Sequence, residues 1–171
     1  MTHLILGGAR SGKTAFALSV AEKTGFQKCM IVTATADDPE MLDRIALHRA
    51  ERSADWLVVE EAQDLCGALR SLVRSDRVVV VDCLTLWLSN LFFVQKDWMA
   101  ETVGLATIVK RPGGRIILVS NEIGFGLAPV NDLGRAFRDA HGRMNQIVAK
   151  ACDEATMVVA GLPIALKSGR N

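Results

Sequence analysis

Short apolar runs without charged residues recur along the chain and alternate with stretches of helical periodicity. Each run is rich in β-branched residues, which is typical of strands that are covered on both faces of a sheet. The predicted strands lie at residues 4–6, 30–33, 78–81, 116–120 and 157–160. The predicted helices lie near residues 13–23, 39–51, 62–74, 83–93 and 131–151. This alternation predicts an α/β fold in which helices cover both faces of a mainly parallel central sheet.

Two of the predicted helices carry recognisable start signals. Asp38-Pro39 places a proline in the first turn of the second helix, where the missing N–H costs no hydrogen bond. Asn131 precedes the last helix and is a residue type that caps helices through its side-chain oxygen. Neither a linker nor an internal repeat interrupts the pattern, so we expect a single domain over residues 1–171.

The strongest chemical signal follows the first predicted strand. Eight residues fit the pattern G-x-x-x-x-G-K-[ST] of a phosphate-binding loop: Gly7, Gly8, Ala9, Arg10, Ser11, Gly12, Lys13 and Thr14. A strand precedes the loop and a helix follows it, so backbone N–H groups and the positive end of the helix dipole can converge on phosphate oxygens. Lys13 would reach the terminal phosphates, and the Thr14 hydroxyl would bind Mg²⁺. The motif predicts a nucleoside triphosphate ligand.

A candidate metal ligand accompanies the phosphate-binding motif. The apolar run Val78-Val79-Val80-Val81 ends in Asp82, a carboxylate that could hold the Mg²⁺ bridging the phosphates. The competing interpretation is that Asp82 simply caps the helix that begins at Cys83.

The composition limits which classes of partner and which cellular compartment we expect. The 171 residues carry a formal net charge of +1, which gives no electrostatic case for nucleic acid as a partner. The longest apolar run is far shorter than a membrane span, and the N-terminus lacks the basic region of a signal peptide. Four scattered cysteines without a C-x-x-C pair suggest buried thiols rather than a zinc site. We therefore predict a cytoplasmic protein with no membrane span.

A histidine among arginines is the next candidate. On the predicted helix, Arg44, His48 and Arg52 lie four residues apart and share one face. Neighbouring cations disfavour a protonated imidazole, so His48 would be neutral and able to act as a nucleophile. Spacing alone favours a solvated charged face with an incidental histidine. His3 and His141 offer weaker signals, since His141 lies in a basic helical stretch.

Taken together, the motifs resemble the bifunctional adenosylcobinamide kinase / adenosylcobinamide-phosphate guanylyltransferase family of cobalamin biosynthesis. The likeness runs almost end to end and keeps the family's order. Besides the phosphate loop, it rests on Arg44 to Arg49, Asp82 to Asn90, Val119 to Gly126 and Phe137 to Gln146. The resemblance implies a P-loop, RecA-like three-layer fold and a homotrimer.

The resemblance also implies two reactions. ATP or GTP phosphorylates adenosylcobinamide. His48 then attacks GTP, and the bound GMP passes to adenosylcobinamide phosphate, giving adenosylcobinamide-GDP. The implied catalytic residues are His48 and Lys13, and the implied metal ligands are Thr14 and Asp82. The implied nucleotide contacts are Gly7, Gly8, Ala9, Arg10, Ser11, Gly12, Lys13, Thr14, Val32, Thr33, Ala34, Arg49, Ala50, Glu51, Arg52, Glu60 and Asp82.

Several positions remain open. Glu60 is either an acceptor for guanine N–H groups or an exposed acid beside Glu61. Glu122 is either a base or corrinoid contact, or a residue that orders its own loop. For Trp98, we favour a place in the core over a place on a corrinoid-facing surface. The alternative functions are a plain small-molecule P-loop kinase, in which His48 is structural, and a non-catalytic GTP-dependent switch.

Overall fold

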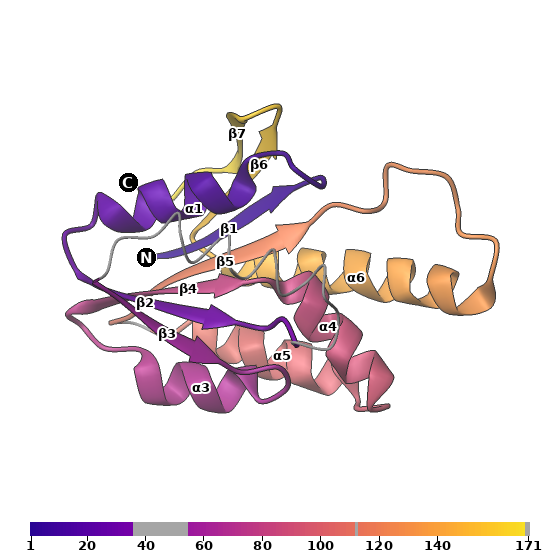
Figure 1. Cartoon of the computed structure of the whole chain (residues 1–171), viewed down its shortest axis with the longest axis horizontal. Coiled ribbons are helices and arrows are strands. Elements are labelled where there is room, and N and C mark those ends of the chain that lie inside the picture. The colour runs from indigo at the N-terminus through magenta and orange to yellow at the C-terminus, as the bar shows by residue number, and fades with distance from the viewer. Residues whose placement is uncertain (36–54, 112, 170–171) are drawn as a thin grey trace.

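A seven-stranded sheet forms the centre of the molecule, with helices on both of its faces (Figure 1). The computed structural model describes residues 1–35, 55–111 and 113–169. The strands are β1 (Thr2–Gly7), β2 (Gln27–Val32), β3 (Trp56–Glu60), β4 (Arg77–Asp82), β5 (Arg115–Asn121), β6 (Glu154–Val159) and β7 (Leu162–Lys167). The helices are α1 (Lys13–Glu22), α3 (Leu65–Leu72), α4 (Leu84–Phe93), α5 (Trp98–Val109) and α6 (Asp132–Ala151).

The strand order determines which residues meet at the site. It is β3-β2-β4-β5-β1-β6-β7, and every pair is parallel except β6 with β7. Parallel strands end at the same edge, where ligands of open α/β sheets bind. At this edge Val32 is in register with both Glu60 and Asp82, while Gly7 is in register with Asn121. β5 therefore lies between the strand of the phosphate loop and the strand of Asp82.

Alternate residues of each central strand pack into two separate cores. In β1, Leu4 and Leu6 join one core with α3, α4, α5 and α6, while Ile5 joins the other core with α1. This alternation follows from the two-residue period of a strand, and both faces are apolar because both are covered. The expected three-layer α/β arrangement is confirmed.

The predicted elements differ from the observed ones in three places. All five predicted strands form, as do four of the five predicted helices, and Asn131 caps α6 by accepting a hydrogen bond from Gly134 N at 2.7 Å. The predicted helix at 39–51 lies outside the described residues. Strands β3 and β7 and helix α5 were not predicted, and Trp98 at the start of α5 packs against the core. Within the described ranges, the search for a helix long and apolar enough to span a membrane finds none.

Candidate active site

The candidate phosphate loop connects β1 to α1 through a tight turn. Gly12 has a φ of 91°, in the left-handed region that residues with a side chain rarely adopt. A Cβ on Gly7 would collide with Ser11 Oγ and would lie 2.7 Å from the Val158 carbonyl oxygen. These two glycines allow the backbone to fold closely at the end of β1, where the first N–H groups of α1 are available to an anion.

Lys13 folds back over this loop. Its Nζ donates a hydrogen bond to the Gly8 carbonyl oxygen at 3.1 Å. Burial lowers the pKa of Lys13 from its ordinary value, while the neighbouring Cys83 and Asp82 groups act to raise it. The charge of Asp82, at the end of β4, therefore acts on Lys13 at the start of α1.

The turn between β6 and β7 packs against the phosphate loop and hydrogen-bonds to it. Gly161 N donates to the Ser11 carbonyl oxygen at 2.9 Å, and a Cβ on Gly12 would lie 3.4 Å from Gly161 Cα. Ala160 and Gly161 both have positive φ values, which makes the turn narrow enough for this approach. Sequence reasoning missed this contact because it places no element after β6.

The other residues of the phosphate loop differ in their exposure to solvent. Gly8 and Thr14 are half-buried, and Ala9 and Arg10 are exposed. Ser11 Oγ is buried and has no hydrogen-bond partner among the residues that the structure describes. This oxygen faces Gly7, where it fills the space that a Cβ would need. Of the oxygen donors predicted for a metal, Thr14 lies in the first turn of α1 and Asp82 ends β4.

Thr33 holds the segment that follows Asp82. Its N–H donates to the Asp82 carbonyl oxygen at 3.1 Å, and its hydroxyl donates to the Cys83 carbonyl oxygen at 2.7 Å and accepts from Cys83 N at 2.9 Å. Asn90 Nδ2 donates to the Thr33 carbonyl oxygen at 2.8 Å. The N-cap of α4 is Cys83, so the interpretation of Asp82 as the cap is wrong.

The remaining predicted contacts fall into two groups. Val32 and Ala34 pack in or against the core, whereas Glu60 is exposed at the end of β3, level with Val32. The neighbouring Glu61 orders its own turn, because its Oε1 accepts from Gln63 N and Asp64 N. The predicted nucleophile His48 and the predicted contacts Arg49, Ala50, Glu51 and Arg52 lie outside the described residues.

A buried polar network at the end of β5 was not predicted. His141 is 1% exposed, and its Nε2 lies 3.0 Å from Thr85 Oγ1. Asn145 Nδ2 donates to the Asn121 carbonyl oxygen at 3.1 Å, and Asn145 Oδ1 accepts from Ser120 Oγ at 2.8 Å. Burial lowers the pKa of His141, and the Glu122 carboxylate acts to raise it. The available signal was helical spacing, because His141 shares a face of α6 with Met144 and Val148.

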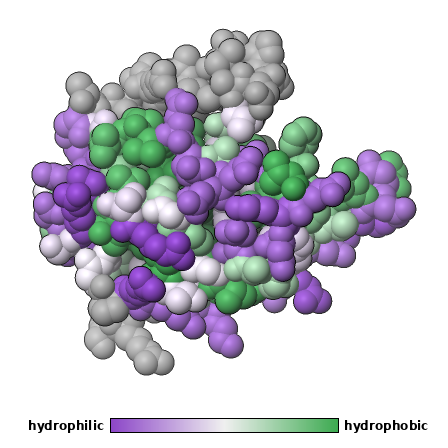
Figure 2. Space-filling model, turned by 90° about the horizontal axis from the view of Figure 1, so that it is seen from below, coloured by the Kyte–Doolittle hydropathy of each residue, from purple (hydrophilic) through white to green (hydrophobic). Residues whose placement is uncertain are grey.

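A segment that projects from the body completes this end of the molecule. We call residues 122–131, which link β5 to α6, the arm. Phe125, Leu127 and Val130 of the arm and Leu133 at the start of α6 are exposed apolar residues. The arm projects to the right in Figure 1, and the same end of the molecule in Figure 2 mixes apolar and polar side chains.

The chain is similar to proteins of cobalamin biosynthesis along almost its whole length. Residues 3–166 match the family described as cobinamide kinase / cobinamide phosphate guanyltransferase. The bifunctional adenosylcobalamin biosynthesis protein CobP of Pseudomonas aeruginosa is 45% identical over 169 residues, which cover 98% of each chain. The bifunctional adenosylcobalamin biosynthesis protein CobU of Escherichia coli is 33% identical over 182 residues, covering 98% of this chain and all of the relative.

Solved structures share the fold at low sequence identity. The RadB recombinase is 15% identical with a TM-score of 0.52, and the match covers 91% of this chain and 73% of that one. The flagellar accessory protein FlaH of Methanocaldococcus jannaschii is 11% identical with a TM-score of 0.54, covering 98% of this chain and 78% of that one. The RecA-like P-loop fold expected from the sequence is confirmed.

Proposed function

Since the chain belongs to the cobinamide kinase / cobinamide phosphate guanyltransferase family, we propose that it catalyses both reactions in that description. In the first, ATP or GTP phosphorylates the aminopropanol hydroxyl of adenosylcobinamide. In the second, GMP passes from GTP to adenosylcobinamide phosphate and yields adenosylcobinamide-GDP. The observation that carries this proposal is the family match along residues 3–166.

The phosphate loop would bind the nucleotide in both reactions. Its tight backbone, the N-terminus of α1 and the Lys13 ammonium present donors and positive charge at one place. Phosphoryl transfer is accelerated mainly by positioning and by charge stabilisation of this kind. The Asp82 carboxylate acts to raise the pKa of Lys13 and so favours its charged form.

The donor set fits Mg²⁺, which we propose to enter with the nucleotide. Mg²⁺ prefers oxygen ligands and usually takes one or two carboxylates together with phosphate oxygens and water. Thr14 and Asp82 supply a hydroxyl and a carboxylate, and no group of three His, Cys, Asp or Glu side chains suited to a metal occurs in the described part of the chain. When bound, the ion would neutralise charge that develops on the phosphates.

Guanylyl transfer would use His48 as its nucleophile. A ring nitrogen of the neutral imidazole would form a bond to the α-phosphorus of GTP, and the bond from that phosphorus to pyrophosphate would break. The phosphate of adenosylcobinamide phosphate would then displace the histidine and take the GMP. Glu60, exposed at the same edge of the sheet, would accept hydrogen bonds from guanine N1–H and N2–H₂.

We further propose that the chain forms a homotrimer in the cytoplasm. The exposed apolar side chains of the arm give the molecule a surface that association would remove from water. The four cysteines are free and buried, which suits a reducing compartment.

The test uses Mg²⁺ and GTP labelled at the α- or the γ-phosphate, with His48→Ala as control. We expect the denatured wild-type chain to retain the α-label only, in a bond that is stable to alkali and labile to acid. We expect His48→Ala to retain none while still binding GTP, because the phosphate loop is unchanged.

The same experiment separates the alternatives. A chain that transfers the γ-phosphate to adenosylcobinamide but never retains the α-label is a plain kinase. A chain that binds GTP and carries out neither transfer is a switch. Retention of the α-label by His48→Ala would contradict the assignment of His48.

A further inference from the structure

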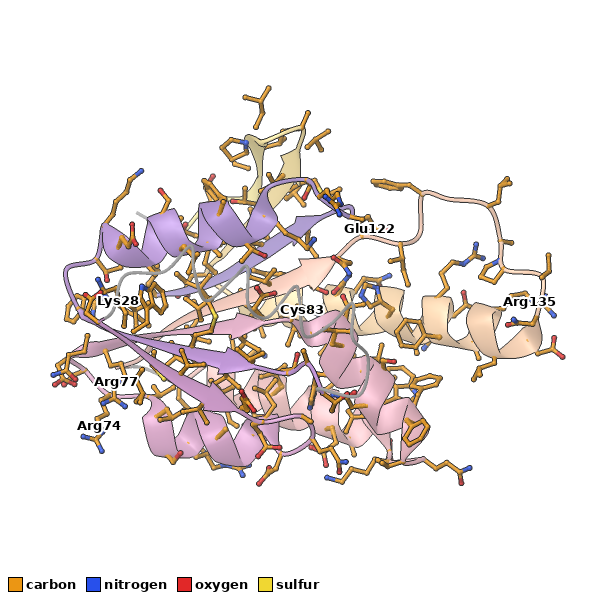
Figure 3. The ribbon with its side chains drawn as sticks, viewed as in Figure 1. Lys28, Arg74, Arg77, Cys83, Glu122 and Arg135 are labelled. Atoms are coloured by element: carbon orange, nitrogen blue, oxygen red, sulfur yellow. The ribbon has the colours of Figure 1, made fainter. Side chains whose placement is uncertain are left out.

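Glu122 places a carboxylate at the start of the phosphate loop. It directly follows β5, the strand between β1 and β4, and its N–H donates to the Gly7 carbonyl oxygen at 3.0 Å. Figure 3 shows Glu122 beside the end of β1. One carboxylate oxygen, Oε1, accepts from Gly124 N at 2.5 Å, which orders the turn. The other oxygen, Oε2, has no hydrogen-bond partner among the residues that the structure describes.

The backbone that carries Glu122 is clamped from two helices. Asn121 N donates to Thr85 Oγ1 of α4 at 2.9 Å, and the Asn121 carbonyl oxygen accepts from Asn145 Nδ2 of α6 at 3.1 Å. Both polar groups of the Asn121 backbone are therefore fixed by side chains. Since the next N–H binds Gly7, the position of Glu122 relative to the phosphate loop is fixed as well.

His141 completes the clamp as a neutral imidazole. Thr85 Oγ1 accepts from Asn121 N and lies 3.0 Å from His141 Nε2. The other ring nitrogen, Nδ1, lies 3.5 Å from Asn145 Nδ2, so the ring connects the two side chains that hold Asn121. Asn145 Oδ1 accepts from Ser120 Oγ at 2.8 Å, which adds β5 to the same network. Such a connected, buried network favours one arrangement of the groups that it holds.

Among the reactions of the proposed function, only the first must remove a proton from its nucleophile. The acceptor of the kinase reaction is an alcohol, whereas the guanylyl steps use a neutral imidazole nitrogen and a phosphate oxygen that is already anionic. A positioned carboxylate beside the phosphate loop suits the first task and is not required for the others.

We propose that Glu122 is the general base of the kinase reaction and that His141 is its positioning residue. The hydroxyl oxygen of the acceptor bonds to the γ-phosphorus, and a carboxylate oxygen of Glu122 takes the proton of that hydroxyl. The bond from the γ-phosphorus to the β-phosphate oxygen breaks, and the nucleoside diphosphate leaves with the electron pair. Glu122 then returns its proton to water. This inference rests on the proposed function, because it concerns one of its two reactions.

The test compares Glu122→Gln with the wild-type chain in both reactions. Glutamine keeps the size and the hydrogen bond to Gly124 but cannot take a proton. We expect the kcat for phosphorylation of adenosylcobinamide to fall by a factor of about 100 to 10,000, with the KM for ATP changed less than threefold. We expect α-label retention on the chain to change less than threefold. The matched control is Glu101→Gln on α5, where the glutamate forms an ion pair with Lys96.

A second pair of variants tests the positioning role. His141→Gln keeps a side chain that can hydrogen-bond Thr85, and His141→Leu removes this hydrogen bond. We expect the leucine variant to lower the kinase kcat more than tenfold at an unchanged KM for ATP, and glutamine to restore most of the activity.

The outcomes separate this inference from the proposed function. A wild-type chain without kinase activity contradicts both. If the wild-type chain phosphorylates adenosylcobinamide and Glu122→Gln does so at a similar rate, only the role of Glu122 is overturned. Equal losses in phosphorylation and α-label retention would also overturn it, because they would show a general effect on the site.

Discussion

At the residue scale, burial sets the charge of the two histidines that the structure describes. His3 and His141 are both almost completely buried. Burial lowers the pKa of each, and the carboxylates Glu154 and Glu122, respectively, act to raise it. Each imidazole has a hydroxyl partner, Thr156 Oγ1 at 2.8 Å for His3 and Thr85 Oγ1 at 3.0 Å for His141.

These histidines make stability depend on pH. In the unfolded chain each would bind a proton as the pH falls below its ordinary pKa near 6.5, whereas the folded chain resists protonation. Acid therefore favours the unfolded state, and the free energy of unfolding should fall between pH 7.5 and 5.5. Each histidine contributes a slope of up to about 1.4 kcal/mol per pH unit in this window.

Urea unfolding at several pH values checks this prediction. His141→Gln should show a shallower dependence on pH than the wild-type chain, because one of the two groups no longer titrates. The same slope in both proteins would contradict the buried, neutral state of His141.

At the element scale, Thr33 joins the end of β2 to the start of α4. Its hydroxyl is the partner of Cys83 N, and its carbonyl oxygen accepts from Asn90 on α4. Because Asp82 immediately precedes Cys83, these bonds fix the backbone on the C-terminal side of the predicted metal ligand. The resemblance predicted Thr33 as a nucleotide contact; the structure shows its side chain fully buried in this joint.

Thr33→Val tests the joint. Valine has nearly the same shape but leaves the buried Cys83 N–H without its partner, which costs about 1–3 kcal/mol. The free energy of unfolding should fall by this amount in urea titrations. Thr33→Ser, which keeps the hydroxyl, should lose much less, and equal losses in the two variants would point to packing instead.

The elements that were missed lack the patterns on which prediction relies. Helix α5 has apolar residues around much of its circumference, so no helical period separates a buried face from an exposed one. Strand β7 is exposed along its whole length and contains Pro163, and β3 is largely exposed. The central strands were predictable because they are buried on both faces.

The site likewise contains features that local sequence predicts and features that it does not. The phosphate loop and Asp82 follow from local sequence, because the motif itself contains the turn and the end of the strand. The contacts of Gly161 with Ser11 and of Thr85 with Asn121 join residues far apart in the chain. Only the strand order brings them together, so neither spacing nor residue type reveals them.

At the scale of the whole molecule, the arm is the surface that we expect to mediate assembly. Leu127 and Val130 are 98% and 96% exposed, which leaves nearly their entire side chains in water. We predict that replacing both with serine shifts the proposed homotrimer to smaller species in size-exclusion chromatography with light scattering. The gain from burying such side chains is about 25 cal/mol per Å², and serine removes it.

Leu162→Ser, on exposed strand β7, is the control for this prediction and should leave the mass unchanged. A double variant that remains trimeric would place the interface elsewhere. A wild-type chain that is monomeric at all concentrations tested would contradict the homotrimer itself.

The strand order also has a consequence for protein synthesis. The two neighbours of β1 in the sheet are β5 and β6, which are translated long after it. The phosphate loop therefore lacks both flanking strands until β5 has been translated, and it lacks the second of them until β6 follows. The turn that supports the loop through Gly161 emerges later still. We expect a growing chain to gain its affinity for nucleotide only after the turn at Gly161 has been translated.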